Sequence, residues 1–168
     1  VTASGGITLI ANDFAIDTSG SPASITSTSG AVTLALSTTT ALTLGTGGQL
    51  LDAELDRIST AGVLTIGSAT TRAGDDGVGD PAVTRTVSSL TLASDISPAG
   101  VSVVHLRSTG AITGTAGGIV VASLAVTGGG GAITLNDATT DVDTLAIANT
   151  GGTVTYVDAD GYSVDSVG

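Results

Sequence analysis

A short phrase recurs along this chain: a small residue, an apolar residue, threonine and a second apolar residue. Copies occupy residues 6–9, 31–34, 63–66, 89–92, 132–135 and 153–156, and a damaged copy occupies residues 111–114. Near the C-terminus the period is fixed, because Ile112, Ile133 and Val154 follow one another at a constant 21-residue interval. Short alternating segments repeated at such an interval are typical of a coil that stacks on copies of itself. The repeat therefore constrains the architecture strongly and the chemistry very little.

One coil can be outlined by laying residues 110–130 over residues 131–151. The overlay aligns three apolar segments: Ile112 with Ile133, Val121 with Val142, and Leu124–Val126 with Leu145–Ile147. We expect a short strand at each of these positions, with corners rich in Gly and Asn between them. The prediction is an all-β fold, a parallel β-helix or β-solenoid with three short strands per coil and about 20–22 residues per coil.

Strand alternation assigns a face to each residue of the repeated phrase. In residues 133–135 the two aliphatic side chains point inward and Thr134 points outward, because successive strand residues face opposite sides. We expect the threonines of all seven phrases to form one outward column, namely Thr8, Thr33, Thr65, Thr91, Thr113, Thr134 and Thr155. A second outward column would contain Ala15, Thr43, His105, Ala125 and Ala146. The interior then consists of continuous aliphatic ladders.

The scarcity of aromatic residues agrees with a narrow interior. The 168 residues include two Tyr, one Phe and no Trp, whereas globular cores rely on aromatic side chains for much of their buried area. Disorder is the competing explanation for a chain rich in Gly, Ser and Thr, but the regular placement of β-branched residues argues against it. We interpret residues 1–168 as a single β-solenoid segment. We expect it to be an excerpt of a longer chain, since neither end supplies the polar cap that a solenoid needs.

The charge balance excludes several classes of partner. The chain has 14 Asp, one Glu, four Arg and no Lys, which gives a formal net charge of −11. Such a surface repels nucleic acid and anionic membranes, so we expect neither as a partner. The uncharged stretches 18–51 and 108–136 are broken by Gly, which argues against a membrane span. Without cysteine, the chain can form neither disulfides nor thiolate metal sites.

In the middle of the chain the copies of the phrase are no longer separated by a constant 21 residues. The interval from Val32 to Leu64 and the interval from Leu64 to Leu90 are both longer than one coil. We place the excess in loop-like insertions near residues 49–60 and 69–84. The second insertion is rich in turn residues, and insertions on a solenoid often form its binding face. Its acids are the candidate interaction loop: Asp75, Asp76 and Asp80.

Residues 51–68 carry a more specific phrase. An acidic Ala-Glu-Leu stretch is followed by Ile and then by a Gly-x-Leu-x-Ile-Gly strand, with matches at Ala53, Glu54, Leu55, Ile58, Gly62, Leu64, Ile66 and Gly67. This segment resembles a phrase common in large bacterial exoproteins of the filamentous haemagglutinin type. The resemblance implies a right-handed parallel β-helix within a long secreted polypeptide, exported by two-partner secretion or as an autotransporter passenger. It also implies an extracellular or cell-surface location.

The function that this resemblance implies is structural and adhesive. The segment would form an elongated rod for cell adhesion, aggregation, or a filament of the extracellular matrix or biofilm. Its partners would be neighbouring coils of the same chain, other rods associated laterally or end to end, and glycans or proteins of host or bacterial surfaces. Two alternatives stay open: a carbohydrate-binding or carbohydrate-active β-helix, which needs an acidic or aromatic cleft, and a β-sandwich adhesin module, which needs longer antiparallel strands.

The sequence contains few residues of the types that act in catalysis. The chain has one histidine, His105, which the predicted alternation places on a strand surface. A Ser-His-Asp arrangement requires a positioned nucleophile, and no nucleophile-elbow phrase occurs. The four arginines are scattered over the chain, at Arg57, Arg72, Arg85 and Arg107. We expect no enzymatic activity and propose no catalytic residue.

Calcium is the more serious chemical candidate. The 21-residue offset places Asp137 over Asp158, with Asp160 nearby. Stacked carboxylates repel unless water solvates them or a cation bridges them, and calcium takes six to eight oxygen ligands. The glycine-rich nonapeptide that binds calcium in other β-helices is absent. We therefore expect solvated acids and no cofactor, and we name Asp137, Asp158 and Asp160 as the weak candidates for calcium.

Overall fold

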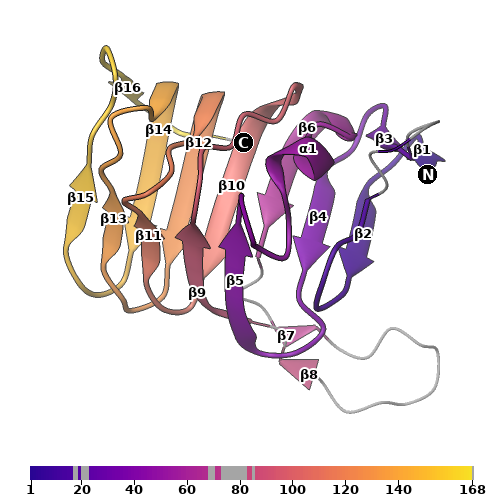
Figure 1. The fold of residues 1–168 in the computed structure, drawn as a ribbon, viewed down its shortest axis with the longest axis horizontal. Coiled ribbons are helices and arrows are strands. Elements are labelled where there is room, and N and C mark those ends of the chain that lie inside the picture. The colour runs from indigo at the N-terminus through magenta and orange to yellow at the C-terminus, as the bar shows by residue number, and fades with distance from the viewer. Residues whose placement is uncertain (17–18, 20–22, 68–70, 73–82, 85, 168) are drawn as a thin grey trace.

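The computed structural model describes residues 1–16, 19, 23–67, 71–72, 83–84 and 86–167 (Figure 1). This part of the chain is all-β apart from one short helix, α1 (Asp52–Leu55). Sheet A is the nine-stranded sheet and contains β1 (Thr2–Ala3), β2 (Ile7–Ile10), β3 (Ile25–Ser27), β4 (Val32–Ala35), β6 (Ile58–Ile66), β10 (Gly100–Ser108), β12 (Val120–Gly128), β14 (Asp141–Asn149) and β16 (Ser163–Val164). Sheet B is five-stranded and contains β5 (Thr40–Leu44), β9 (Val87–Leu92), β11 (Ile112–Gly114), β13 (Ile133–Leu135) and β15 (Val154–Tyr156).

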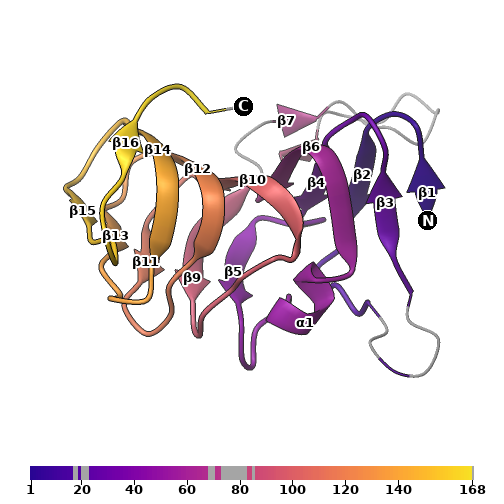
Figure 2. The same ribbon diagram turned by 90° about the horizontal axis from the view of Figure 1, so that it is seen from above.

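From β9 onward the chain visits the two sheets in strict alternation. It passes from β9 in sheet B to β10 in sheet A, returns to β11, and continues in this way to β16. β9 and β10 pair in parallel with β5 and β6, and from β11 onward each strand pairs in parallel with the strand two positions earlier in the chain. Figures 1 and 2 show the two sheets facing each other with the strands advancing along the long axis. We call one strand of sheet B with the following strand of sheet A a repeat.

The register confirms the predicted 21-residue offset in the last third of the chain. Ile112 pairs with Ile133 and Ile133 with Val154. In sheet A, Val121 pairs with Val142 and Leu124 with Leu145. Residues that lie 21 positions apart in the sequence are therefore neighbours on adjacent strands.

The number of strands per repeat differs from the prediction of three short strands. The second and third predicted strands are one nine-residue strand, β12, because no Gly, Pro or Asn separates Val121 from Leu124. Both residues are nevertheless buried although they lie three positions apart, which a flat strand does not permit. The strand therefore bends at Ala122 and Ser123. The corner that we expected between the second and third short strands is a bend inside one continuous strand.

The outward columns also differ from the prediction. Thr8, Thr33 and Thr65 stack in sheet A, where His105, Ala125 and Ala146 continue their column. Thr91 stacks instead in sheet B, in a column with Thr43, Thr113, Thr134 and Thr155. The single predicted threonine column is thus wrong. Both sheets are half-buried, so the same alternating phrase suits either one and does not specify which sheet it joins.

The space between the sheets is filled by aliphatic ladders. The longest one crosses seven strands of sheet A and contains Ile7, Val32, Leu64, Val104, Leu124, Leu145 and Val164. Its central members Leu64, Val104 and Leu124 are 0% exposed. Full burial of such a side chain stabilises the fold by about 1.5–3 kcal/mol. Because the ladder runs from β2 to β16, the interior is continuous along the stack.

The first strands of sheet A follow the same path as the later long strands but are broken in the middle. The first half of β6 pairs with β3 and its second half pairs with β4. The break between β3 and β4 is a tight turn in which the Ser27 hydroxyl accepts a hydrogen bond from the Gly30 N–H at 3.0 Å. A Cβ at Gly30 would lie closer than 3.0 Å to the Gly6 backbone. Close approach of neighbouring backbones therefore requires glycine at position 30.

The two predicted insertions have different outcomes. Residues 49–60 form regular structure that packs on the core: Leu50 forms a bridge with Leu44, α1 follows, and β6 begins at Ile58. Leu50, Leu55 and Ile58 are fully buried. Of the insertion at 69–84, the structure describes β7 (Thr71–Arg72) and β8 (Val83–Thr84), which pair antiparallel. The predicted interaction loop with Asp75, Asp76 and Asp80 lies outside the described residues.

Candidate functional site

The carboxylates of α1 and its C-terminal end accept hydrogen bonds from backbone N–H groups, most of them in other segments. Glu54 is buried, and its Oε1 accepts a hydrogen bond from the Ile16 N–H at 3.0 Å while its Oε2 accepts one from the Leu51 N–H at 2.8 Å. The Asp52 carboxylate accepts from the Ser97 N–H and the Asp56 carboxylate accepts from the Ala99 N–H. These acids hold α1 against the segments on either side of it. Their role is in packing, which explains the Ala-Glu-Leu phrase in structural terms.

A second carboxylate contact lies at the corner where the chain crosses from sheet B to sheet A. The Asp95 Oδ1 atom accepts a hydrogen bond from the Gly118 N–H at 2.8 Å and one from the Thr139 hydroxyl at 2.7 Å. Asp95, Gly118 and Thr139 belong to three successive repeats, so one side chain connects all three. These hydrogen bonds, first from Gly118 and then from Thr139, lower the pKa of Asp95 below its ordinary value.

The Asp95 contact predicts a pH dependence of stability. Because the pKa of Asp95 is lower in the folded protein than in the unfolded chain, its contribution is present above the unfolded value of about 3.9 and is lost as the pH falls through the folded value. We expect Asp95→Asn, which keeps an acceptor oxygen but does not titrate, to flatten the fall in melting temperature below about pH 4. Thr139→Val should flatten it less. Melting curves at a series of pH values measure the effect, and an unchanged slope in Asp95→Asn would contradict the assignment.

Three acids from the last two repeats lie close together. The carboxylates of Asp141, Asp158 and Asp160 each place an oxygen within 4.8 Å of the other two. Two of them, Asp158 and Asp160, are among the weak calcium candidates named from the sequence. Asp137 lies apart, and its Oδ1 accepts hydrogen bonds from the N–H and hydroxyl of Thr139. Asp141 takes its place in the cluster because β16 pairs Ser163 with Thr144, which makes the final repeat shorter than the repeats before it.

Asp158 is already engaged by protein donors. Its Oδ2 accepts hydrogen bonds from the Tyr156 hydroxyl at 2.7 Å and the Val142 N–H at 3.1 Å, and its Oδ1 accepts one from the Gly161 N–H at 2.9 Å. Slight burial acts to raise the pKa of Asp158, but these hydrogen bonds outweigh it and the pKa is lowered. The pKa of Tyr156 is raised, first by burial and then by its hydrogen bond to the Asp158 carboxylate. Through these hydrogen bonds the Asp158 carboxylate connects the last corner to β14.

These contacts lead to a prediction about calcium. Because Asp158 has internal partners, we expect a chelator such as EDTA to leave the melting temperature unchanged and added calcium to raise it by less than about 2 °C. Thermal unfolding in EDTA and in millimolar calcium measures both effects. A calcium-dependent rise that disappears in Asp160→Asn but persists in Asp137→Asn would contradict this expectation and assign a calcium site to the cluster.

His105 lies on the outer face of sheet A, where its ring Nε2 is 2.8 Å from the Thr127 hydroxyl. Partial burial, and next the charge of Arg107, lower the pKa of this histidine. A lowered pKa favours the neutral ring at physiological pH. Within the described part of the chain, the ring makes its hydrogen bond to this hydroxyl, and the geometry supplies no carboxylate to orient it for catalysis.

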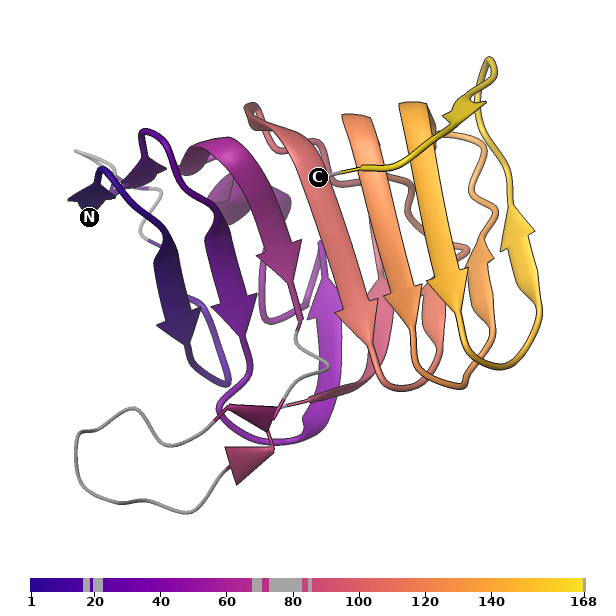
Figure 3. The same cartoon turned by 180° about the vertical axis from the view of Figure 1, so that it is seen from behind.

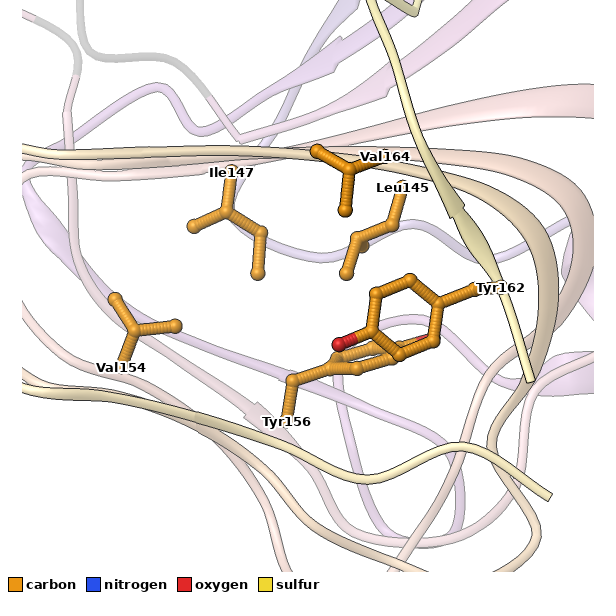
Figure 4. Close-up of a pocket in the computed structure, with 6 residues that line it drawn as sticks. All are labelled: Leu145, Ile147, Val154, Tyr156, Tyr162 and Val164. Atoms are coloured by element: carbon orange, nitrogen blue, oxygen red, sulfur yellow. The ribbon is translucent and has the colours of Figure 1, made fainter. Parts of the chain in front are cut away.

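The apolar pocket at the end of the stack is the feature that sequence reasoning missed. Its volume is about 390 Å³ and its lining residues are Leu145, Ile147, Val154, Tyr156, Tyr162 and Val164. Figure 4 shows Val154 and Tyr156 opposite Leu145, Ile147 and Val164, with the two tyrosine rings side by side. The rings meet edge to face, with centroids 4.8 Å apart and an interplanar angle of 81°. We call these six residues the end face.

One signal in the sequence could have indicated the end face. The chain has two tyrosines, Tyr156 and Tyr162, and both lie in its last repeat. Apart from Phe14, the buried hydrophobic core consists of aliphatic residues, so an aromatic pair marks a place where the repeat changes.

The arginines of the described part of the chain belong to different elements. Arg57 precedes β6 and Arg107 lies in β10, and the Nε atoms of both are buried. Arg72 lies in β7, whereas Arg85 lies outside the described residues.

No family model, no curated protein and no solved structure matches this chain. Within the described residues, α1 spans four residues and no helix has the length and apolar character needed to cross a membrane.

Proposed function

We propose that residues 1–168 form a right-handed β-solenoid segment of a large secreted bacterial surface protein of the filamentous haemagglutinin type. The observation that carries this proposal is the seven-strand ladder from Ile7 to Val164, in which neighbouring members come from successive turns of the chain. Such a ladder buries its apolar residues only through stacking, so each added coil lengthens the rod without widening it. The parallel pairing of the strands in sheets A and B disfavours the alternative of a β-sandwich module.

The surface chemistry supports a structural role. Several acids accept backbone hydrogen bonds from neighbouring coils, as Asp52, Asp56 and Asp95 do. The aliphatic side chains line the interior while threonines lie on both outer faces. These features suit a hydrated rod that presents surface over a long distance. We propose an extracellular location, adhesion or aggregation as the activity, and glycans or proteins of cell surfaces as ligands.

The test is to display residues 1–168 on the surface of a non-aggregating bacterium and to measure cell aggregation and retention on glycan and matrix-protein arrays. We expect aggregation or retention with the wild-type segment and with Thr134→Asp, which alters an outward position. Ile133→Asp, which alters the interior, should abolish both. A folded segment that neither aggregates cells nor binds any array would contradict the adhesive role. Release of reducing sugar from a polysaccharide would favour a carbohydrate-active solenoid instead.

A further inference from the structure

The positive charge of sheet A is confined to one strand. The strands β4, β6 and β12 contain no charged side chain and no histidine, whereas β10 contains His105 and Arg107. Both side chains lie on the outer face, because the residues that alternate with them, Val104, Leu106 and Ser108, are fully buried. Since β10 lies between β6 and β12 in the middle of the sheet (Figure 3), the surroundings of these side chains do not depend on either end of the chain.

Arg107 is a cation without a partner in the described part of the chain. Its Nε atom is buried and donates no hydrogen bond, and its guanidinium forms no ion pair or hydrogen bond among the described residues. A guanidinium carries five N–H donors and stays charged at physiological pH. A buried polar atom that lacks a partner requires an explanation, and an external ligand is one. Because Arg107 is partly exposed, an anion in solution can reach the side chain.

The neighbours of Arg107 supply hydrogen-bonding groups and little bulk. On one side Arg107 pairs with Thr127, which pairs in turn with Ala148. The Thr127 hydroxyl lies 2.8 Å from the Nε2 atom of His105 and so holds the imidazole ring beside this ladder. On the other side lies Gly67, where a Cβ would be closer than 3.0 Å to the Arg107 carbonyl oxygen. We call Arg107, His105 and Thr127 the basic patch.

The acids of the last two repeats lie toward the opposite end of these strands. Asp143 is the third residue of β14, whereas the ladder of Arg107 crosses β14 at Ala148, its eighth residue. Five strand residues span roughly 16 Å, and β12 also lies between β14 and β10. This separation exceeds the Debye length of about 8 Å, so the repulsion that these acids exert on an anion at Arg107 is largely screened. The last residues of the chain cross this face nearer to the beginning of the strands than to their arrowheads (Figure 3).

We propose that the basic patch binds the carboxylate of an acidic sugar, such as a uronic or sialic acid residue at the end of a glycan. The planar fork of Arg107 matches a carboxylate through two parallel hydrogen bonds. The His105 ring and the Thr127 hydroxyl add neutral hydrogen-bonding groups for the hydroxyls of the sugar. A single carboxylate is favoured over a sulfated chain, because a chain of net charge −11 repels an extended polyanion more than it repels one charge. This inference rests on the proposed adhesion to glycans and names the class of glycan.

The experiment is a titration of ¹⁵N-labelled residues 1–168 with two matched pairs of sugars, followed through the arginine Nε–H signals. The pairs are methyl glucuronide with methyl glucoside, and sialyllactose with lactose. The chain has four arginines, so the Arg107 signal is assigned from the spectrum of Arg107→Gln. We expect both acidic sugars to shift this signal with dissociation constants of about 1–10 mM and both neutral sugars to leave it unchanged. Acetate, which supplies the carboxylate alone, should bind at least about fivefold more weakly than either acidic sugar.

Variants locate the binding on the basic patch. Arg107→Gln keeps a polar side chain but removes the charge, and we expect it to weaken acidic-sugar binding at least about tenfold. Arg107→Lys keeps the charge but not the fork, so its loss should be smaller. The matched control is Arg57→Gln, which alters the other described arginine with a buried, unpartnered Nε; Arg57 precedes β6, and binding should stay as in wild type. The backbone amide signals of Thr127 and Ala148 report binding in the variants that lack Arg107.

A further variant blocks the basic patch without removing its arginine. Thr127→Glu places a carboxylate on the neighbouring strand directly beside Arg107, where it competes with the sugar for the guanidinium. We expect acidic-sugar binding to fall at least about tenfold in this variant. Circular dichroism and melting curves confirm that each variant is folded, so a loss of binding is not a loss of structure.

The outcomes separate this inference from the proposed function. A folded protein whose Arg107 signal responds to neither acidic sugar at about 20 mM overturns the basic patch and leaves adhesion to be judged by aggregation and arrays. Equal responses to acidic and neutral sugars, acetate binding as strong as that of the sugars, or unchanged binding in Arg107→Gln overturn it as well. Tighter binding of a sulfated oligosaccharide overturns the choice of a carboxylate. Acidic-sugar binding by a segment that neither aggregates cells nor binds any array supports the basic patch and overturns the adhesive role.

Discussion

Ile133→Asp is expected to unfold the C-terminal repeats. Ile133 is 0% exposed and lies in sheet B between Ile112 and Val154, so an aspartate there is surrounded by aliphatic side chains without a donor. An unpaired buried charge of this kind costs several kcal/mol, and we expect a loss of more than about 4 kcal/mol. For a chain of this length the loss corresponds to a fall in melting temperature of about 10 °C or more. Thermal unfolding followed by circular dichroism measures it.

Thr134→Asp is the matched control for this variant, because it introduces the same side chain one residue later in the same strand. Thr134 belongs to the outward column of sheet B and is partly exposed. Solvent reaches the carboxylate there, so we expect a change within about 1 kcal/mol. Equal melting temperatures for the two variants would contradict the assignment of inner and outer faces.

Gly67→Ala is expected to have the second largest effect. Gly67 follows β6 with φ = +84°, in the left-handed region, where an L-residue costs about 1–2 kcal/mol. A Cβ at this position would also lie closer than 3.0 Å to the Arg107 carbonyl oxygen of the next strand in sheet A. Because that neighbour is backbone, the contact cannot be relieved without separating β6 from β10. We expect a combined loss of at least about 3 kcal/mol in chemical denaturation.

Two other glycines separate the conformational effect from the steric effect. Gly47 has φ = +74° but no atom within 4 Å of the point where a Cβ would lie, so Gly47→Ala should cost about 1 kcal/mol from conformation alone. Gly5 has neither a left-handed φ nor a neighbour within 4 Å, so Gly5→Ala should be close to neutral. If Gly67→Ala costs no more than Gly47→Ala, the close approach of β6 and β10 at this point is wrong.

The sequence pattern predicts the ladders well and the sheets poorly. The 21-residue offset places Ile112 under Ile133 because repeats of equal length stack residue on residue. It does not reveal that Leu90 stacks on Leu42 in sheet B while Leu64 stacks on Val104 in sheet A. The reason is physical: a half-buried strand in either sheet requires the same alternation of apolar and polar residues. Only the contacts across the interior distinguish the two sheets, and these are not local in sequence.

The candidate sites likewise can be predicted where they depend on residues close in the sequence and cannot where they depend on contacts distant in the sequence. Asp158 and Asp160 can be identified as neighbours because they lie close in the sequence, whereas their third partner, Asp141, depends on the shortened spacing of the last repeat. The helix α1 carries no long apolar period, and the sequence pattern assigns its residues to a loop-like insertion. Its formation depends on burial of Leu55 and on the Glu54 carboxylate, which accepts hydrogen bonds from two backbone N–H groups. Such tertiary contacts override the weak helical preference of a four-residue segment.

The strict alternation between sheets A and B has a mechanical consequence. Hydrogen bonds between strands of successive turns run along the long axis, so a lengthwise pull loads them in tension one layer at a time. Each layer contacts chiefly its two neighbours, and the rupture of one leaves the next intact. A stack of this kind would release about 20 residues of extended chain, roughly 70 Å, at each step, and each step would absorb work. Under shear it would lengthen in increments before it failed.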